Sequence, residues 1–249
     1  MISLKTPEQL RLMREAGRIT AETLLYVGEI IREGMTTLEL DRQIRQFIER
    51  HGATPSFLGY NGFPGSACIS LNDEVIHGIP SKKRIIREGD LVKVDVGACW
   101  RGYHGDSART YPIGQVSEEA KSLLEHTRES FFCAMKVALA GNRVGDIGSA
   151  VDTHIRTAGF SVVREFVGHG IGAALHEEPD VPNYGTPGRG ARLYPGMVIA
   201  VEPMVNAGAP EVRVLSDGWT VVTKDGSLSA HYENTIAITD NGPMILTEA

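Results

Sequence analysis

The sequence predicts an α+β protein built from two similar halves that face each other across a pseudo-twofold axis. Residues match at one fixed offset of 107 positions, the matched segments share helix start and stop signals, and the matched strands share a β-branched composition. The matching pairs are Gly34 and Gly141, Ile44 and Val151, Ile48 and Ile155, Gly52 and Gly159, and Gly89 and Gly196. We therefore expect a single domain over residues 1–249, with halves of about 1–125 and 126–249.

Each half is expected to carry a helix followed by a strand. After Gly34, apolar residues recur four apart between a glycine turn and a glycine stop, which is typical of an amphipathic helix. After Gly89, the segment LVKVDVG has the β-branched composition of a strand, and MVIAVEPM follows the matched glycine of the second half. The offset aligns Asp95 with Glu202, so one carboxylate from each half is expected to point into a shared cleft.

Composition excludes several classes of protein. Of 249 residues, 42% are hydrophobic and 22% are charged, which is ordinary for a globular domain, and the net charge of −6 argues against nucleic acid as a ligand. The N-terminal segment has no apolar core of signal-peptide length, and no apolar run is long enough to cross a bilayer. Three widely spaced cysteines encode neither a disulfide framework nor a zinc ribbon. We expect a cytoplasmic protein without a membrane or nucleic-acid partner.

Two acidic residues lie inside a predicted β-hairpin. The segment LVKVDVGACWRGYHGDSARTY is expected to turn near Arg101 and Gly102, with Asp95 in the first arm and Asp106 in the second. Both side chains would then emerge on one face, where like charges repel. Because burying an unpaired carboxylate is costly, this pair indicates a bound metal ion.

The second half repeats this pattern of acidic residues. Glu202 ends the apolar strand VIAVEPM, and Glu233 lies in the expected strand SAHYENTIAIT, on one face with His231 and Thr235. His169 lies in FVGHGIG, where glycines would allow a close approach to whatever the imidazole binds. Four carboxylates and one imidazole suit manganese, iron(II), cobalt or zinc in a site for two metal ions.

Other interpretations of these residues are weaker. Taken singly, each acidic residue could be a solvated strand end, but chance would have to place acids in four apolar strands. The segment GHGIGA fits a loose dinucleotide-binding pattern, although nearby prolines oppose the helix that such a site needs. Neither HExxH nor GxSxG occurs in the sequence. His77 and His176 are either surface histidines or hydrogen-bond donors beside the metal site.

In order and spacing, these motifs resemble the five metal-ligand motifs of the methionine aminopeptidases. They are VDVG with Asp95, GDSART with Asp106, GHGIG with His169, VEPM with Glu202 and YENT with Glu233. The resemblance covers nearly the whole chain and implies the pita-bread fold, in which duplicated α+β halves surround a central antiparallel sheet. The sequence is similar to the short type I form of these enzymes, without a zinc-binding N-terminal extension or the helical insertion of type II enzymes.

The resemblance implies a role for each metal ligand. Asp95 would chelate one ion, Asp106 and Glu233 would bridge both, and His169 with Glu202 would complete the second. A bridging water would attack the carbonyl of the first residue, with Glu202 as the proton shuttle.

It also implies a substrate pocket and a site for a monovalent cation. His176 would steady the tetrahedral intermediate, and His77 would contact the departing amide. Tyr60, Phe63, Cys68 and Trp219 match positions that line a methionine side-chain pocket, while Phe57 stands where cysteine is frequent and Leu175 where an aromatic residue is frequent. Asn72 and Ser229 resemble a site for a monovalent cation.

The expected function is removal of the initiator methionine from nascent proteins whose second residue is small. The partners implied are the N-termini of nascent polypeptides near the ribosome, and the protein is expected to be a monomer. One alternative is a proline-specific peptidase of the same fold, although those relatives carry an extra N-terminal domain. Another is a pita-bread binding protein without catalysis, but such relatives lose metal ligands and all five are present here.

Overall fold

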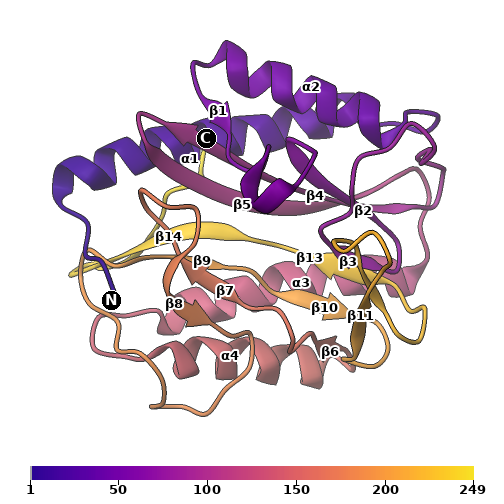
Figure 1. Cartoon of the computed structure of the whole chain (residues 1–249). Helices are drawn as coiled ribbons and strands as arrows, with labels where there is room; N and C mark the ends of the chain where they lie inside the picture. The colour runs from indigo at the N-terminus through magenta and orange to yellow at the C-terminus, as the bar shows by residue number, and fades with distance from the viewer. Residues whose placement is uncertain (1) are drawn as a thin grey trace.

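The computed structural model describes residues 2–249, in which a pair of helices followed by a run of strands occurs twice along the chain (Figure 1). The α-helices are α1 (Pro7–Ile30), α2 (Thr37–Arg50), α3 (Glu118–Val137) and α4 (Val144–Thr157), and η1 (Tyr60–Gly62) is a short 3₁₀ turn. The strands are β1 (Thr54–Pro55), β2 (Ala67–Leu71), β3 (Glu74–Ile76), β4 (Leu91–Trp100), β5 (Tyr103–Pro112), β6 (Ser161–Val162), β7 (Gly168–Gly170), β8 (Glu177–Val181), β9 (Val198–Val201), β10 (Met204–Asn206), β11 (Val212–Val214), β12 (Val221–Thr223), β13 (Ser229–His231), β14 (Asn234–Thr239) and β15 (Gly242–Ile245). Among these residues, no helix is long and apolar enough to cross a membrane.

The strands form a layer between the two helix pairs. Figure 1 shows α1 and α2 on one side of the strands and α3 and α4 on the other. In one sheet β4 pairs with β1, β2 and β5, and in another the order is β15-β14-β9-β7-β8. These two sheets meet where β5 runs beside β14, because the Glu233 N–H donates to the Ala108 carbonyl at 3.0 Å and the Asp106 N–H donates to Thr235 Oγ1 at 3.0 Å. The predicted α+β fold of duplicated halves is confirmed.

The helices of the two halves match at the predicted offset. α2 and α4 each have 14 residues and begin 107 positions apart. Gly34 and Gly141 precede them with φ of +83° and +97°, a left-handed conformation that a residue with a side chain rarely adopts. α3 spans the predicted boundary near residue 125, so the second half begins with α3, after the loop at 113–117.

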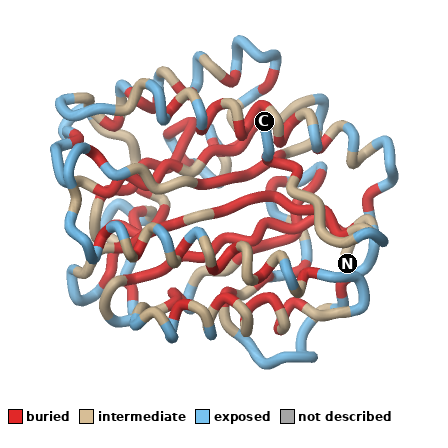
Figure 2. The backbone as a smooth tube through the Cα atoms, turned by 180° about the vertical axis from the view of Figure 1, so that it is seen from behind, coloured by how far each residue is buried: buried red, intermediate tan, exposed pale blue. Residues whose placement is uncertain are grey.

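Apolar side chains fill the space between each helix pair and its strands. Ile19, Ile44 and Val94 belong to the cluster under α1 and α2, and Phe131 and Ile199 belong to the cluster under α3 and α4. All five are at most 1% exposed. Figure 2 shows strands that are mostly red between helices in which red alternates with tan and pale blue. Each fully buried large side chain contributes about 1.5 to 3 kcal/mol of transfer free energy, so these clusters fix the strands that carry the acidic residues.

Candidate active site

The hairpin of β4 and β5 brings its two aspartates to one face, as predicted. Arg101 and Gly102 form the turn with φ of +48° and +80°, the type I′ geometry that suits the twist of two paired strands. Asp95 pairs with Ala108, and Asp106 pairs with Gly97, so the aspartates are diagonal neighbours on the same face. The turn therefore sets the register that places these carboxylates together.

The two glutamates lie where neighbouring strands are interrupted. Glu202 follows the end of β9, before Pro203, which has no N–H to continue a strand ladder. The predicted continuous strand over residues 229–239 is wrong, because it breaks at Tyr232 and Glu233 between β13 and β14. The Tyr232 N–H donates to the Pro203 carbonyl at 3.2 Å, so the two interruptions lie side by side. Each interruption presents one carboxylate to the hairpin.

His169 reaches the carboxylates from β7. Its Nε2 lies 3.6 Å from Glu202 Oε1 and 3.8 Å from Asp106 Oδ2, and its Nδ1 lies 2.9 Å from the Gly170 carbonyl. A proton on Nδ1 satisfies that carbonyl and leaves the Nε2 lone pair free to bind a cation. The flanking glycines have a different role from the predicted one. A side chain at Gly168 would overlap the carbonyl of Ala200, so glycine serves the close packing of strands.

The electrostatics of this cluster favour a bound cation. Asp106 and Glu233 are 4% and 2% exposed, and Asp106 Oδ1, Asp95 Oδ1 and Glu233 Oε1 are buried without a hydrogen-bond partner. Burial raises the pKa of Asp106 to about 7. Burial and nearby carboxylates also raise the pKa values of Asp95, Glu202 and Glu233 well above the ordinary range. Buried carboxylate oxygens without hydrogen-bond partners, beside the free Nε2 of His169, form a donor set that fits a divalent transition metal.

His231 is a residue of this cluster that the sequence analysis did not assign. It is 2% exposed, its ring nitrogens have no hydrogen-bond partner, and its Nε2 lies 3.8 Å from Glu233 Oε2 and 3.9 Å from Glu202 Oε2. Ligand atoms of Asp95, His231 and Glu233 lie close enough together to hold one ion, and those of Asp106, His169 and Glu233 do the same. The position of His231 two residues before Glu233 in SAHYENT was the available signal in the sequence.

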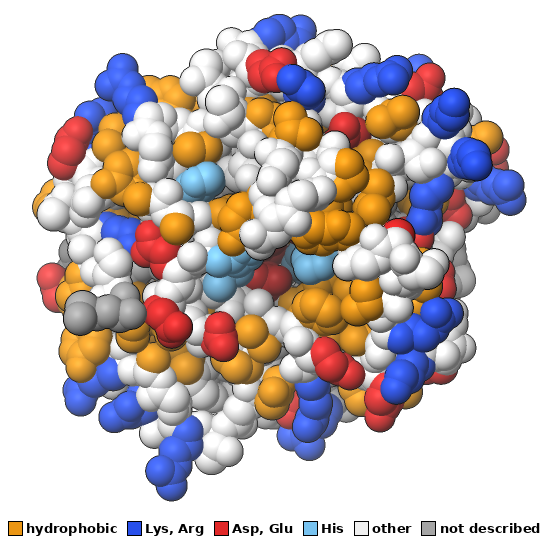
Figure 3. Space-filling model, in the orientation of Figure 1, with side chains coloured by type: hydrophobic (Ala, Val, Ile, Leu, Met, Phe, Trp, Pro, Cys, Tyr) orange, Lys and Arg blue, Asp and Glu red, His pale blue; other side chains and the backbone are white. Residues whose placement is uncertain are grey.

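The carboxylates form the floor of a cavity with apolar walls. Its volume is about 280 Å³, and all eleven residues predicted for catalysis, metal binding or the substrate pocket line it. The apolar walls include Phe57, Tyr60, Phe63, Cys68, Leu175 and Trp219. Figure 3 shows histidine and acidic side chains at the centre of a hollow ringed by hydrophobic groups. Phe166 also lines it, with its ring edge-on to His77, and no sequence signal pointed to that residue.

His77 and His176 enter the cavity from different loops. His77 has φ of +59°, a strained backbone for a residue other than glycine, and burial lowers its pKa to about 4. His176 packs edge-on against His169, with ring centroids 4.0 Å apart, and its Nδ1 lies 2.7 Å from the Tyr60 hydroxyl. Burial also lowers the pKa of His176. Both imidazoles are therefore neutral near pH 7 and can donate one hydrogen bond each.

Lys93 fills the place expected for a monovalent cation. Its Nζ donates to the backbone carbonyl of Asn72 at 2.6 Å and to that of Ser229 at 2.9 Å, and the residue is 1% exposed. Burial lowers the pKa of Lys93 to about 7, while the nearby carboxylates of Glu74, Asp73 and Asp90 act to raise it. The expectation of a separate ion between Asn72 and Ser229 is corrected, because an ammonium group already binds both carbonyls.

Comparison with known proteins identifies the family of the chain. The model of metallopeptidase family M24 matches residues 11–240. The methionine aminopeptidase of Clostridium perfringens is 55% identical over 247 residues, which cover 99% of each chain. The crystal structure of a methionine aminopeptidase from Thermotoga maritima superposes with a TM-score of 0.98 and 44% identity over the full length of both chains. A prolidase from Pyrococcus furiosus matches with a TM-score of 0.80 and 25% identity, and the chain covers 65% of it. The chain therefore belongs to metallopeptidase family M24, and within that family to the methionine aminopeptidases.

Proposed function

We propose that the protein removes the N-terminal methionine from polypeptides whose second residue is small, using two divalent metal ions. The observation that supports this function is one cavity with an acidic, histidine-bearing floor and an apolar wall. At about 280 Å³ the cavity has room for a single side chain and its flanking peptide groups. A wall of aromatic rings, with the sulfur of Cys68, suits a flexible thioether better than a charged or polar side chain.

We assign the metal ligands to the five predicted residues. Asp95 would hold one ion, His169 and Glu202 the other, and Asp106 and Glu233 would be shared. When bound, the ions would lower the pKa of a coordinated water and polarise the scissile carbonyl. Cobalt, manganese, iron(II) and zinc all suit this donor set, and supply in the cell decides among them.

The remaining chemistry is assigned to side chains at the edge of the floor. Glu202 is a predicted metal ligand that also lines the cavity, and its side chain is 12% exposed, so its carboxylate can take a proton from water and pass it to the departing amine. Neutral His176 would donate a hydrogen bond to the oxygen that gains negative charge. Neutral His77, packed against Trp219, would donate to the peptide group on the departing side.

Specificity for a small second residue is also part of the proposal. Phe57 and Leu175 keep the wall apolar and are 7% and 3% exposed. The substrates would be the N-termini of nascent polypeptides near the ribosome, met by a monomer in the cytoplasm. The net charge of −6 supports a partner other than nucleic acid.

Peptide hydrolysis by metal-free protein reconstituted separately with cobalt, manganese, iron(II) and zinc tests the proposal. We expect methionine release from Met-Ala-Ser, much slower release from Met-Leu-Ser, and no cleavage of Gly-Pro-Ala. Cleavage of the proline peptide instead would assign proline specificity. No cleavage with any metal would support a binding protein.

A pair of glutamine variants tests the role of Glu202. Glu202→Gln keeps the shape of the side chain and should lower kcat by at least about 100-fold, as loss of a general base does. Glu178→Gln, at an exposed position on β8, is the matched control and should be fully active. A folded Glu202→Gln protein with normal activity would exclude the assigned role.

A further inference from the structure

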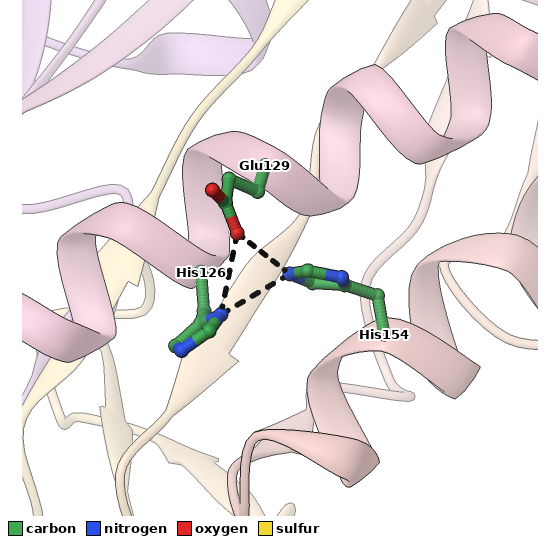
Figure 4. Close-up of side chains that lie close together, drawn as sticks. All are labelled: His126, Glu129 and His154. Carbon is green, nitrogen blue, oxygen red and sulfur yellow. Dashed lines mark hydrogen bonds and ion pairs between the residues drawn. The ribbon is translucent and has the colours of Figure 1, made fainter.

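Two histidines and a glutamate meet between α3 and α4, on helices that the candidate active site does not use. His126 and Glu129 are three residues apart on one face of α3, and His154 faces them from α4 (Figure 4). None of the three lines the cavity of the candidate active site. Their side chains are 32%, 46% and 24% exposed, so the cluster is open to solvent.

The three facing atoms form a nearly equilateral triangle. His126 Nδ1 lies 3.2 Å from His154 Nε2 and 3.5 Å from Glu129 Oε2, and His154 Nε2 lies 3.4 Å from the same Glu129 oxygen. Metal–ligand bonds of about 2.0 to 2.2 Å at tetrahedral angles place neighbouring ligand atoms about 3.3 to 3.6 Å apart. The cluster therefore has the spacing of three ligands on one face of a tetrahedral ion.

A fourth side chain, Cys133, favours the tautomer of His154 in which Nε2 is free to bind a metal. Cys133 Sγ lies 3.7 Å from His154 Nδ1, on the far side of that imidazole from the cluster. A proton on Nδ1 that points at the sulfur leaves the Nε2 lone pair directed at the cluster. Support of a ligating imidazole through its second nitrogen is the usual arrangement in metal sites.

Within residues 2–249, the matching helix pair of the first half does not repeat this cluster. In the matching helix pair of the first half, His51 Nε2 lies 3.9 Å from Glu22 Oε2 at the side of α1 and α2. Among the described residues no third ligand joins that pair, because the groups able to hold an ion are the two at the active-site floor and the α3–α4 cluster. The first half thus supplies a natural control of similar chemistry.

We propose that His126, Glu129 and His154 form a separate binding site for a divalent transition metal of the zinc, nickel, copper or cobalt class. Two imidazoles and one carboxylate suit these ions better than magnesium or calcium. Three protein ligands leave a fourth position to water, so the ion is exchangeable. Because its ligands come from two helices, the ion ties α3 to α4 and stabilises that helix pair. It takes no part in peptide hydrolysis.

Metal counting with matched variants tests the proposal. Wild type, the double variant His126→Ala/His154→Ala and the control His51→Ala are dialysed against zinc and then analysed for bound zinc by mass spectrometry. Wild type and His51→Ala should retain one more zinc ion per chain than the double variant. Equal zinc in all three would overturn the proposal. Glu129→Gln, which preserves the helix surface, provides a second variant if the double variant loses its circular dichroism spectrum.

Two further readouts separate this site from the active site. Crystals containing zinc should show an anomalous peak between the three side chains, and peaks at the active-site floor alone would overturn the proposal. Cys133→Ala should weaken zinc binding to the cluster by about 10-fold or more, as loss of a supporting partner does. The double variant should hydrolyse Met-Ala-Ser at the wild-type rate but gain less in melting temperature from zinc. An equal gain in melting temperature would exclude the link between α3 and α4.

Discussion

Binding of a divalent ion to the active-site carboxylates should release protons near neutral pH. Asp106 has a pKa of about 7, so it holds about half a proton at pH 7 and about 0.9 at pH 6 before the ion binds. The raised pKa values of Asp95, Glu202 and Glu233 allow up to one further proton from each. His169 holds no proton to release, because burial lowers its pKa to about 3.

The sign of the pH dependence follows from the form that binds. Metal ions bind the deprotonated carboxylates, so the apparent affinity must rise with pH wherever the free protein still holds protons. Asp106 alone should tighten binding about fivefold between pH 6 and pH 7, and each further carboxyl group that remains protonated adds about tenfold per pH unit. The groups are close together, so the measured protons belong to the cluster as a whole.

Calorimetry in two buffers of different ionisation enthalpy measures the released protons directly. The double variant His126→Ala/His154→Ala is the protein to use, because the α3–α4 cluster then adds no heat of its own. We expect proton release that grows as the pH falls from about 8 to about 6. Absence of release at pH 6, together with an affinity that does not change with pH, would refute the assigned effect of burial on these carboxyl groups.

Three substitutions test other parts of the structure. Lys93→Ala should lower the free energy of unfolding by about 2 to 4 kcal/mol. Potassium chloride should restore the stability of this variant more than choline chloride does, whereas the two salts should affect wild type equally. The same response to both salts in the variant and in wild type would contradict this prediction. Gly168→Ala should lower the free energy of unfolding in urea by about 1 to 3 kcal/mol and reduce the amount of bound metal. The control is Gly28→Ala, which should not destabilise the protein, because the added methyl group would meet only Tyr111, at 3.4 Å. Tyr60→Phe should lower kcat/KM about 3- to 10-fold without changing stability, and unchanged kinetics would show that its hydroxyl does not orient His176.

The sequence was most informative where local chemistry determines geometry. A turn that needs left-handed residues fixes the β4–β5 register, and the register alone puts Asp95 and Asp106 on one face. It was least informative where packing between distant segments decides. The break at Tyr232 and Glu233 lies beside Pro203, between two other strands, and the approach of His154 to α3 depends on how two helices pack. No periodicity in the sequence encodes either contact.

Lys93 replaces the free cation that the positions of Asn72 and Ser229 led us to expect. The alternation in LVKVDVG places Lys93 on the same face as Asp95, and Asn72 and Ser229 do converge as a cation site requires. A free ion must be bound from solution at a cost in entropy, whereas an ammonium on a buried strand is held in place by the fold itself. The two carbonyls come from opposite halves of the chain, so the lysine also joins those halves beside the metal ligands. Occupation of this position is therefore independent of the cation supply, and this is why potassium should affect only a variant that lacks the lysine.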